Sequence, residues 1–246
     1  GKKVKQIFPG AIVSYGESEV SVQLLANQFQ QDPIYILNQS IERLEYNFCR
    51  AFYRVLNYKK KKQIVFSRGH GEMFELNLAD MVNELREFYE VNAVEIKNDI
   101  SVLDRDDISC LIIAKPDSAF DDASKFIIDQ YIMRGGRVLW LLDNVFTSLD
   151  SIGDKNYTVA FPYDLGLYEQ LFKYGVRINP TIIQDNECAK IRVDYGNYGT
   201  QKNEDLFPWY YYPVITPDGQ HPIVKNINSL KLKFANSMDT IKTPGI

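Results

Sequence analysis

Cysteine and histidine are scarce in this sequence. Only three cysteines occur in 246 residues, and Cys49, Cys110 and Cys188 are odd in number and far apart, which excludes a disulfide-stabilised scaffold. The two histidines, His70 and His221, are also far apart, and no close pair of cysteines accompanies them. A zinc site is therefore not expected, and we predict neither a metal nor a cofactor.

Long apolar runs are missing as well. The two longest, Cys110–Ala114 and Val138–Leu142, have five residues each, whereas a membrane-spanning helix needs about 20. The basic start Gly1–Lys5 is not followed by an apolar segment, so it is not a signal peptide. Because both ends are polar and carry no closing element, we expect the chain to be a soluble piece of a longer protein; a complete cytosolic protein is the alternative.

Two further absences restrict the function. The chain has 28 Lys and Arg against 32 Asp and Glu, a net charge of −4 with a pI near 5.3, which argues against binding to nucleic acid. No phosphate-binding loop, three-glycine dinucleotide motif or nucleophile elbow follows an expected strand. These absences favour a protein that is not an enzyme.

The N-terminal part is predicted to form a hairpin and a helix. Ile7–Tyr15 and Glu19–Leu25 are β-prone runs joined by residues with turn chemistry. Ser40 is expected to cap the helix that follows. Apolar side chains recur along one face of this helix at three- and four-residue steps, at Ile41, Leu44, Phe48, Phe52 and Val55. Because a second chain could cover the apolar faces of the hairpin and the helix, a homodimer is one expected assembly.

The middle of the chain alternates between strands and helices. Short apolar strands are expected at residues 63–67, 91–96, 110–114 and 137–142, with amphipathic helices between them. Asp121 or Asp122 is expected to cap the helix that runs to Met133. This pattern predicts an α/β fold with a doubly wound, mainly parallel sheet that is covered on both faces.

Three regions follow from these patterns. Residues 1–58 are predicted to form the N-terminal hairpin and helix, residues 63–180 a three-layer α/β domain, and residues 181–246 a β- and loop-rich extension that packs on it. The three could also form one continuous domain. In the extension, Thr181–Gln184 and Lys190–Val193 are strand-like, and Cys188 is expected to be the exposed cysteine, in a polar loop between them.

Polar side chains follow three of the expected strands. His70 and Glu72 follow the first, Lys115 and Asp117 the third, and Asp143 the fourth. Because ligands bind outside the carboxyl ends of parallel strands, these five residues are predicted to lie along one rim and bind a ligand. His70 and Glu72 could act as acid and base, and Lys115 could hold an anion. The other interpretation is that polar residues simply mark exposed strand ends.

An aromatic block stands out in the last third. Trp209, Tyr210, Tyr211 and Tyr212 lie between two prolines, which suits an extended segment. Such clusters are favoured in interfaces and in sugar-stacking sites, so the block is a candidate interaction surface. The alternative is that alternate rings cover the sheet or a domain junction.

Several segments, in this order, resemble one known family. They are Ile7–Ala11, Ser14–Gly16, Ser40–Tyr46, Gly69–Glu72, Ile113–Asp117, Ile128–Gly136, Leu171–Asn179 and Pro208–Tyr211. Together they resemble the gliding-motility-associated ABC transporter auxiliary proteins of Bacteroidota, the substrate-binding-like GldG family. The resemblance runs from about Ile7 to Ile241.

The resemblance implies more than the spacing does. Such proteins are partners of the membrane permease and ATPase subunits of an ABC transporter needed for gliding and its linked secretion machinery. This chain would be the periplasmic region of a protein anchored in the inner membrane by helices outside this sequence. The fold would be flavodoxin-like or glutamine-amidotransferase-like, similar also to intraflagellar-transport-type domains, with no catalytic nucleophile.

Three functions are therefore weighed. The first is a non-enzymatic periplasmic module that binds protein partners or a ligand. The second is a hydrolase or transferase, which requires His70, Glu72 and Asp143 to converge in one pocket. The third is a carbohydrate-binding module, which requires Trp209 and a neighbouring tyrosine to be exposed and coplanar.

Overall fold

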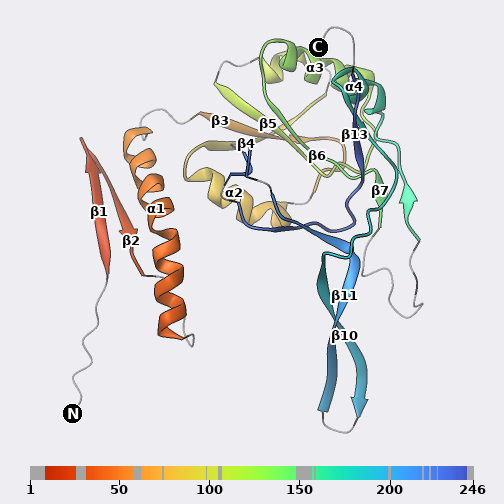
Figure 1. Ribbon diagram of the computed structural model, residues 1–246. Helices are drawn as coiled ribbons and strands as arrows, with labels where there is room; N and C mark the ends of the chain where they lie inside the picture. The colour runs from red at the N-terminus through yellow and green to blue at the C-terminus, as the bar shows by residue number, and fades with distance from the viewer. Residues whose placement is uncertain are drawn as a thin grey trace, which may run out of the picture.

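A computed structural model gives the arrangement of most of the chain. It describes residues 9–25, 32–57, 62–73, 75–97, 99–104, 107–147, 157, 159–198, 201–217, 219–221, 223–225 and 227–242, with the backbone alone at 194–198 and 201–204. The fold is mixed α/β: one four-stranded parallel sheet is accompanied by small antiparallel sheets (Figure 1).

The N-terminal hairpin and helix form as predicted, but the helix begins earlier than expected. Strands β1 (Gly10–Tyr15) and β2 (Ser18–Gln23) are antiparallel, and α1 spans Pro33–Asn57. Asp32 caps α1, since its carboxylate accepts the N–H of Ile34 at 2.7 Å. The prediction of a cap at Ser40 was wrong: Ser40 lies inside the helix, where its hydroxyl donates to the Ile36 carbonyl at 2.6 Å.

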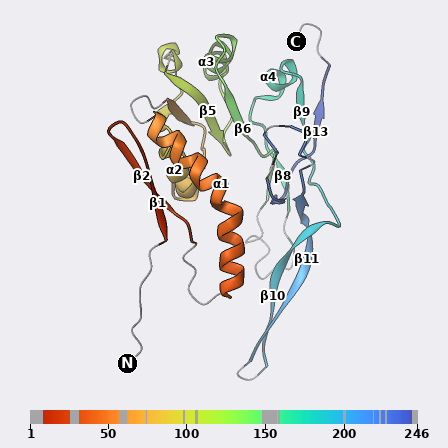
Figure 2. The same ribbon diagram turned by 60° about the vertical axis from the view of Figure 1, so that its left-hand side comes forward.

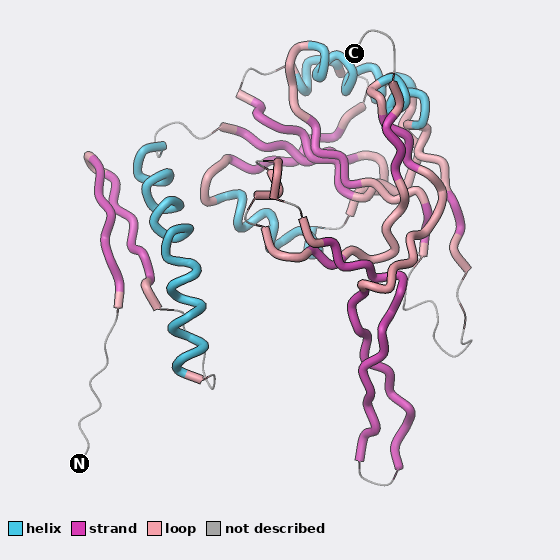
Figure 3. The backbone as a smooth tube through the Cα atoms, viewed as in Figure 1, coloured by secondary structure: helices cyan, strands magenta, loops and turns pink. Residues whose placement is uncertain are grey.

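The parallel sheet lies at the centre of the α/β region, with the strand order β4-β3-β5-β6 (Figure 3). Its strands are β3 (Gln63–Arg68), β4 (Glu90–Glu95), β5 (Ile108–Ala114) and β6 (Val138–Leu141). The strands occur where the apolar runs predicted them. Because all four are parallel, their carboxyl ends meet at one edge of the sheet.

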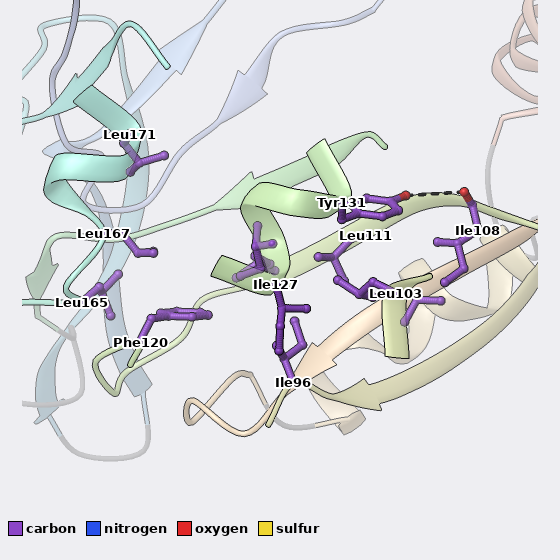
Figure 4. Packing of buried hydrophobic residues seen from close by; sticks show 13 residues of the cluster. Ile96, Leu103, Ile108, Leu111, Phe120, Ile127, Tyr131, Leu165, Leu167 and Leu171 are labelled. Atoms are coloured by element: carbon purple, nitrogen blue, oxygen red, sulfur yellow. Dashed lines mark hydrogen bonds between the residues drawn. The ribbon is translucent and has the colours of Figure 1, made fainter. Parts of the chain in front are cut away.

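Helices cover both faces of this sheet. On one face, Ile127 of α3 (Asp122–Met133) packs with Leu111 of β5 (Figure 4). Ile128 and Ile113 belong to the same cluster. On the other face, α2 (Ala79–Arg86), preceded by the 3₁₀ turn Glu75–Leu78, covers Phe66 and Ile112. The alternation of side chains along each strand thus divides the core into two layers.

Asp121 decides where α3 begins. Its carboxylate accepts the N–H of Ser124 at 2.7 Å, which satisfies one of the free donors of the first turn. Asp121, rather than Asp122, is therefore the cap.

The C-terminal third adds a long hairpin and several short pairings. The elements are β7 (Val145–Phe146), β8 (Phe161–Pro162), α4 (Tyr168–Lys173), β9 (Val176–Ile178), β10 (Cys188–Tyr198), β11 (Gln201–Ile215), β12 (Leu230–Lys231) and β13 (Met238–Thr240). The β10–β11 hairpin projects away from the α/β region (Figures 1 and 2). Strand β13 returns to pair with β9, where Asp239 forms an ion pair with Arg177. Thr181–Gln184, predicted as strand-like, is not in a strand.

The cysteines are unpaired, and their exposure differs from the expectation. Cys49 is exposed on α1, whereas Cys110 and Cys188 are half-buried. The prediction that Cys188 would be the exposed one was wrong, because this residue begins β10 and pairs with Pro213 of β11. Within the described ranges, no helix has both the length and the apolar character to cross a bilayer.

The core assignment predicts the effect of one substitution. Leu111→Ala is expected to lower the free energy of unfolding by about 2–5 kcal/mol, because the side chain is 0% exposed at the centre of the sheet. Leu76→Ala is the matched control: it removes the same atoms from a side chain that is 76% exposed and should cost less than about 0.5 kcal/mol. Urea unfolding followed by circular dichroism measures both, and equal losses would contradict the assignment.

Candidate functional site

The predicted rim residues lie in three loops at the carboxyl edge of the parallel sheet. The loop after β3 carries His70 and Glu72, the loop after β5 carries Lys115 and Asp117, and Asp143 follows β6. The first two loops are joined by backbone hydrogen bonds. Met73 N–H donates to the Ala114 carbonyl at 2.9 Å, and the N–H groups of Asp117 and Ser118 donate to the His70 carbonyl at 3.1 and 3.0 Å.

His70 is a buried residue. Its ring stacks on Phe120, with ring centroids 3.8 Å apart and an interplanar angle of 11°. Its Nδ1 lies 3.7 Å from Glu72 Oε1, which is longer than a hydrogen bond. Because the ring is buried against Phe120, a substrate has no open approach to the imidazole.

Glu72 holds the loop after β3 in shape. The side chain is only 6% exposed, and Oε2 accepts the N–H of His70 at 2.8 Å. Burial alone would raise the pKa of this carboxyl. The His70 side chain, the N–H groups of His70 and Glu72, and the Ser67 hydroxyl outweigh burial and lower the pKa to about 2. Glu72 is therefore a carboxylate at neutral pH with a role in loop structure.

Gly71 and Asp117 bring the two loops into close contact. Gly71 has a φ of +68°, and a Cβ at this position would overlap the carboxylate of Asp117. Asp117 in turn accepts the Ser118 hydroxyl at 2.7 Å. Only glycine fits at this position, so the close approach of the two loops depends on glycine at residue 71.

Lys115 and Asp143 form a separate pair. Lys115 Nζ lies 3.3 Å from Asp143 Oδ2, and both side chains are partly exposed. Tyr163, which the sequence did not single out, lies beside them. Burial, together with the negative charges of Asp143 and Asp117, raises the pKa of Tyr163 to about 12. No signal in the sequence marks Tyr163, because its position depends on tertiary packing alone.

The five rim residues therefore form two groups rather than one. No hydrogen bond or ion pair in the described part of the chain joins Asp143 to His70 or Glu72. A cavity of about 740 Å³ lies beside the rim between α2 and the sheet, and neither His70 nor Asp143 lines it. The convergence required of a His/Glu/Asp hydrolase is not present. Among the described residues, no group of three or more His, Cys, Asp and Glu could hold a metal ion.

The aromatic block lies at an interruption of the β10–β11 ladder. Lys190 pairs with Pro208 and Cys188 with Pro213, so the four aromatic residues between the prolines stand opposite Ala189 alone. Proline is tolerated at such interruptions because it has no N–H to contribute to the ladder. The sequence predicted an extended segment, but it did not predict this bulge.

The four aromatic side chains have different environments. Tyr212 is buried and meets Phe234 edge-to-face, with centroids 5.2 Å apart, so it belongs to the core and not to an interaction surface. Tyr210 is 50% exposed. The rings of Trp209 and Tyr211 are half-buried and inclined at 58°, which is not the coplanar platform that a sugar-stacking site requires.

Comparison with known proteins identifies the family. Residues 61–246 match the family described as an ABC-type uncharacterized transport system, and this match covers most of the chain. The chain belongs to this ABC transport auxiliary family. It is therefore an auxiliary component of an ABC-type transport system. The matched residues contain the whole parallel sheet and the C-terminal third, whereas β1, β2 and α1 precede them.

Other comparisons add little. No curated protein matched the sequence. Among solved structures, the chain is similar to one described as the mmIFT52 N-terminal domain, with a TM-score of 0.48 and 15% identity, covering 73% of this chain and 68% of that one.

The environment of Glu72 predicts a pH-dependent contribution to stability. Its folded pKa of about 2 lies below the ordinary value of 4.5. The carboxylate therefore stabilises the fold fully above about pH 4.5, and this contribution is lost as the pH falls toward 2. Glu72→Gln should cost roughly 2–3 kcal/mol at pH 7 and should weaken the loss of stability between pH 4.5 and 2.

Glu75→Gln is the matched control for this experiment. Glu75 is exposed and pairs with Arg68 at the surface, so its substitution should change the free energy of unfolding by less than about 1 kcal/mol. Urea unfolding at several pH values measures both variants. A Glu72→Gln variant with the pH profile of the wild type would contradict the structural role of this carboxylate.

Proposed function

We propose that this chain is a non-enzymatic periplasmic module of a gliding-motility-associated ABC transporter complex. In this proposal it belongs to a protein anchored in the inner membrane and binds the permease and ATPase subunits. The match of residues 61–246 to the ABC transport auxiliary family carries the proposal. The resemblance to the GldG proteins of Bacteroidota supports the finer role in gliding and linked secretion, and the periplasmic location.

The chemistry of the rim supports a role without catalysis. His70 is buried under Phe120, and the carboxylate of Glu72 is engaged by backbone N–H groups. Asp143 is paired with Lys115 and does not contact the imidazole. An acid or base needs access to the proton that it transfers, and none of these groups combines access with a suitable partner.

The strand order supports the finer fold assignment. In chain order, β4-β3-β5-β6 reads 2-1-3-4, which matches the first four strands of the flavodoxin-like order. We propose that the α/β region is doubly wound in this manner.

The projecting β10–β11 hairpin is the surface that we assign to the transporter subunits. Leu206, Phe207 and Tyr210 of β11 are exposed large apolar residues on this hairpin. Aromatic residues on a rigid, projecting strand are typical of binding surfaces, because they bury a large area at a small cost in entropy. Of the predicted aromatic block, Tyr210 is the residue with an accessible ring.

Affinity capture from membranes tests the proposal. The tagged membrane protein that contains this chain is expected to retain the permease and ATPase subunits of an ABC transporter. Tyr210→Ala should reduce their recovery at least about fivefold, because truncation of an interface anchor costs more than about 1 kcal/mol. Tyr168→Ala is the matched control: this ring is also exposed, but on α4, and its loss should leave recovery unchanged.

Two results would contradict this proposal. Absence of both subunits from the captured material would remove the role in the transporter. Normal gliding in cells that lack the protein would remove the role in motility.

We also propose that the module acts as a homodimer, because the N-terminal hairpin and helix α1 leave large apolar side chains exposed to solvent. Its interface is separate from the hairpin assigned to the transporter.

A further inference from the structure

In the part of the chain that the structure describes, strand β1 pairs with β2 alone, and its other edge lacks the features that usually protect an edge strand. Leu24 N–H donates to the Pro9 carbonyl, so the odd-numbered residues of β1 bond to β2. Gly10, Ile12 and Ser14 therefore direct their N–H and C=O groups away from the hairpin. The strand Gly10–Tyr15 contains no charge, proline or bulge, although edge strands are normally protected by one of these.

The other edge of the hairpin lies beside α1. Residues 20–25, in and directly after β2, line a hollow of about 480 Å³ with α1 side chains that include Arg43, Arg50 and Arg54. Asn47 of α1 also donates to the Gln23 carbonyl at 3.4 Å. Residues Ser18–Val20 of β2 also line a hollow of about 200 Å³ together with Phe88 of the α/β region. The free edge of β1 therefore faces away from the α/β region (Figure 1).

Helix α1 carries an apolar stripe that the rest of the described chain leaves largely open. Its exposed members are Ile34, Leu37, Ile41, Leu44 and Phe52, with exposed fractions of 38–69%, whereas Phe48 and Val55 on the same face are half-buried and buried. These residues recur at mostly three- and four-residue steps, which is the spacing of a face that packs on another element.

The stripe is on the same side of α1 as the free edge of β1. Arg50 forms ion pairs with Glu84 and Glu87, so this side of the helix faces the α/β region. Ala51 is buried against the hairpin. In a view down the axis of a helix with 3.6 residues per turn, the direction in which Ala51 points lies between those of Arg50 and Leu44. The hairpin contact thus separates the stripe from the α/β region.

We propose that two copies of this chain associate through the β1 edge and the α1 stripe. This inference rests on the homodimer put forward with the proposed function and assigns its surface. Antiparallel pairing of β1 about Ile12 places Gly10 opposite Ser14 of the second copy and satisfies the free N–H and C=O groups of both. The two hairpins become one four-stranded sheet, whereas a two-stranded sheet alone is only marginally stable.

The surface area of the β1 edge and the α1 stripe is that of an interface with a second copy of this chain. Aromatic side chains bury about 150–250 Å² each when fully covered, and isoleucine and leucine bury somewhat less. Complete burial of the exposed part of the stripe and of Ile12, together with the strand edge, would therefore cover on the order of 600–800 Å² per copy. A standard interface buries roughly 800 Å² per partner. A single strand or helix from another protein would cover only one of the two features.

Proline at Ile12 tests the edge. The N–H of Ile12 points away from β2, so Ile12→Pro removes an edge donor without breaking the hairpin ladder. We expect a dimer for the wild type by light scattering after size exclusion, and at least about a tenfold weaker association for Ile12→Pro. Ser21→Pro is the matched control, because the N–H of Ser21 also points out of the ladder but on the β2 edge beside α1; this variant should stay dimeric.

A charged side chain introduced into the α1 stripe tests whether the helix contributes to the dimer interface. Ile41→Glu should give a monomer with unchanged circular dichroism, and Leu76→Glu, at an exposed leucine outside this surface, should remain a dimer. A monomeric wild type would overturn the inference, even if it still captures the permease and ATPase subunits. If the wild type and both variants, Ile12→Pro and Ile41→Glu, were dimeric, the assignment of the dimer to this surface would be overturned. Loss of subunit capture from a wild-type dimer would count against the transporter role alone.

Discussion

Strands β3 and β5 bury both of their faces, and the rest of the α/β region depends on this constraint. Val65 and Phe66 are adjacent on β3 but face opposite layers of the core. One layer requires α3 and the other requires α2, so the chain must cross the sheet on each side. The crossings leave the loops after β3 and β5 next to each other at one rim, where Glu72 and Gly71 fix their shape.

At this rim, residue types that often act in catalysis have structural roles. A carboxylate that accepts backbone N–H groups, a stacked imidazole and a Lys115–Asp143 pair would each look catalytic in a sequence. In the folded chain Glu72 accepts the N–H of His70 and holds the loop after β3, the His70 ring packs on Phe120, and Lys115 pairs with Asp143 at the partly exposed rim.

Much of the sheet could be predicted from the sequence, because its signals are local. The apolar runs located β3 to β6, and Asp121 marked the start of α3. The site could not be predicted to the same extent. The stacking of His70 on Phe120 brings together residues that are distant in the sequence. The start of α1 was misjudged because Asp32 and Ser40 are equally plausible caps, and only the structure distinguishes them.

The pairing of β13 with β9 has a consequence for biosynthesis. Residues 238–240 complete a two-stranded sheet with residues 176–178, so β9 leaves the ribosome long before its partner does. Until then its outer N–H and C=O groups are open to water or to another strand. The α/β region of a nascent chain would therefore finish folding late, and a chain shortened before Met238 would expose a strand that is normally covered.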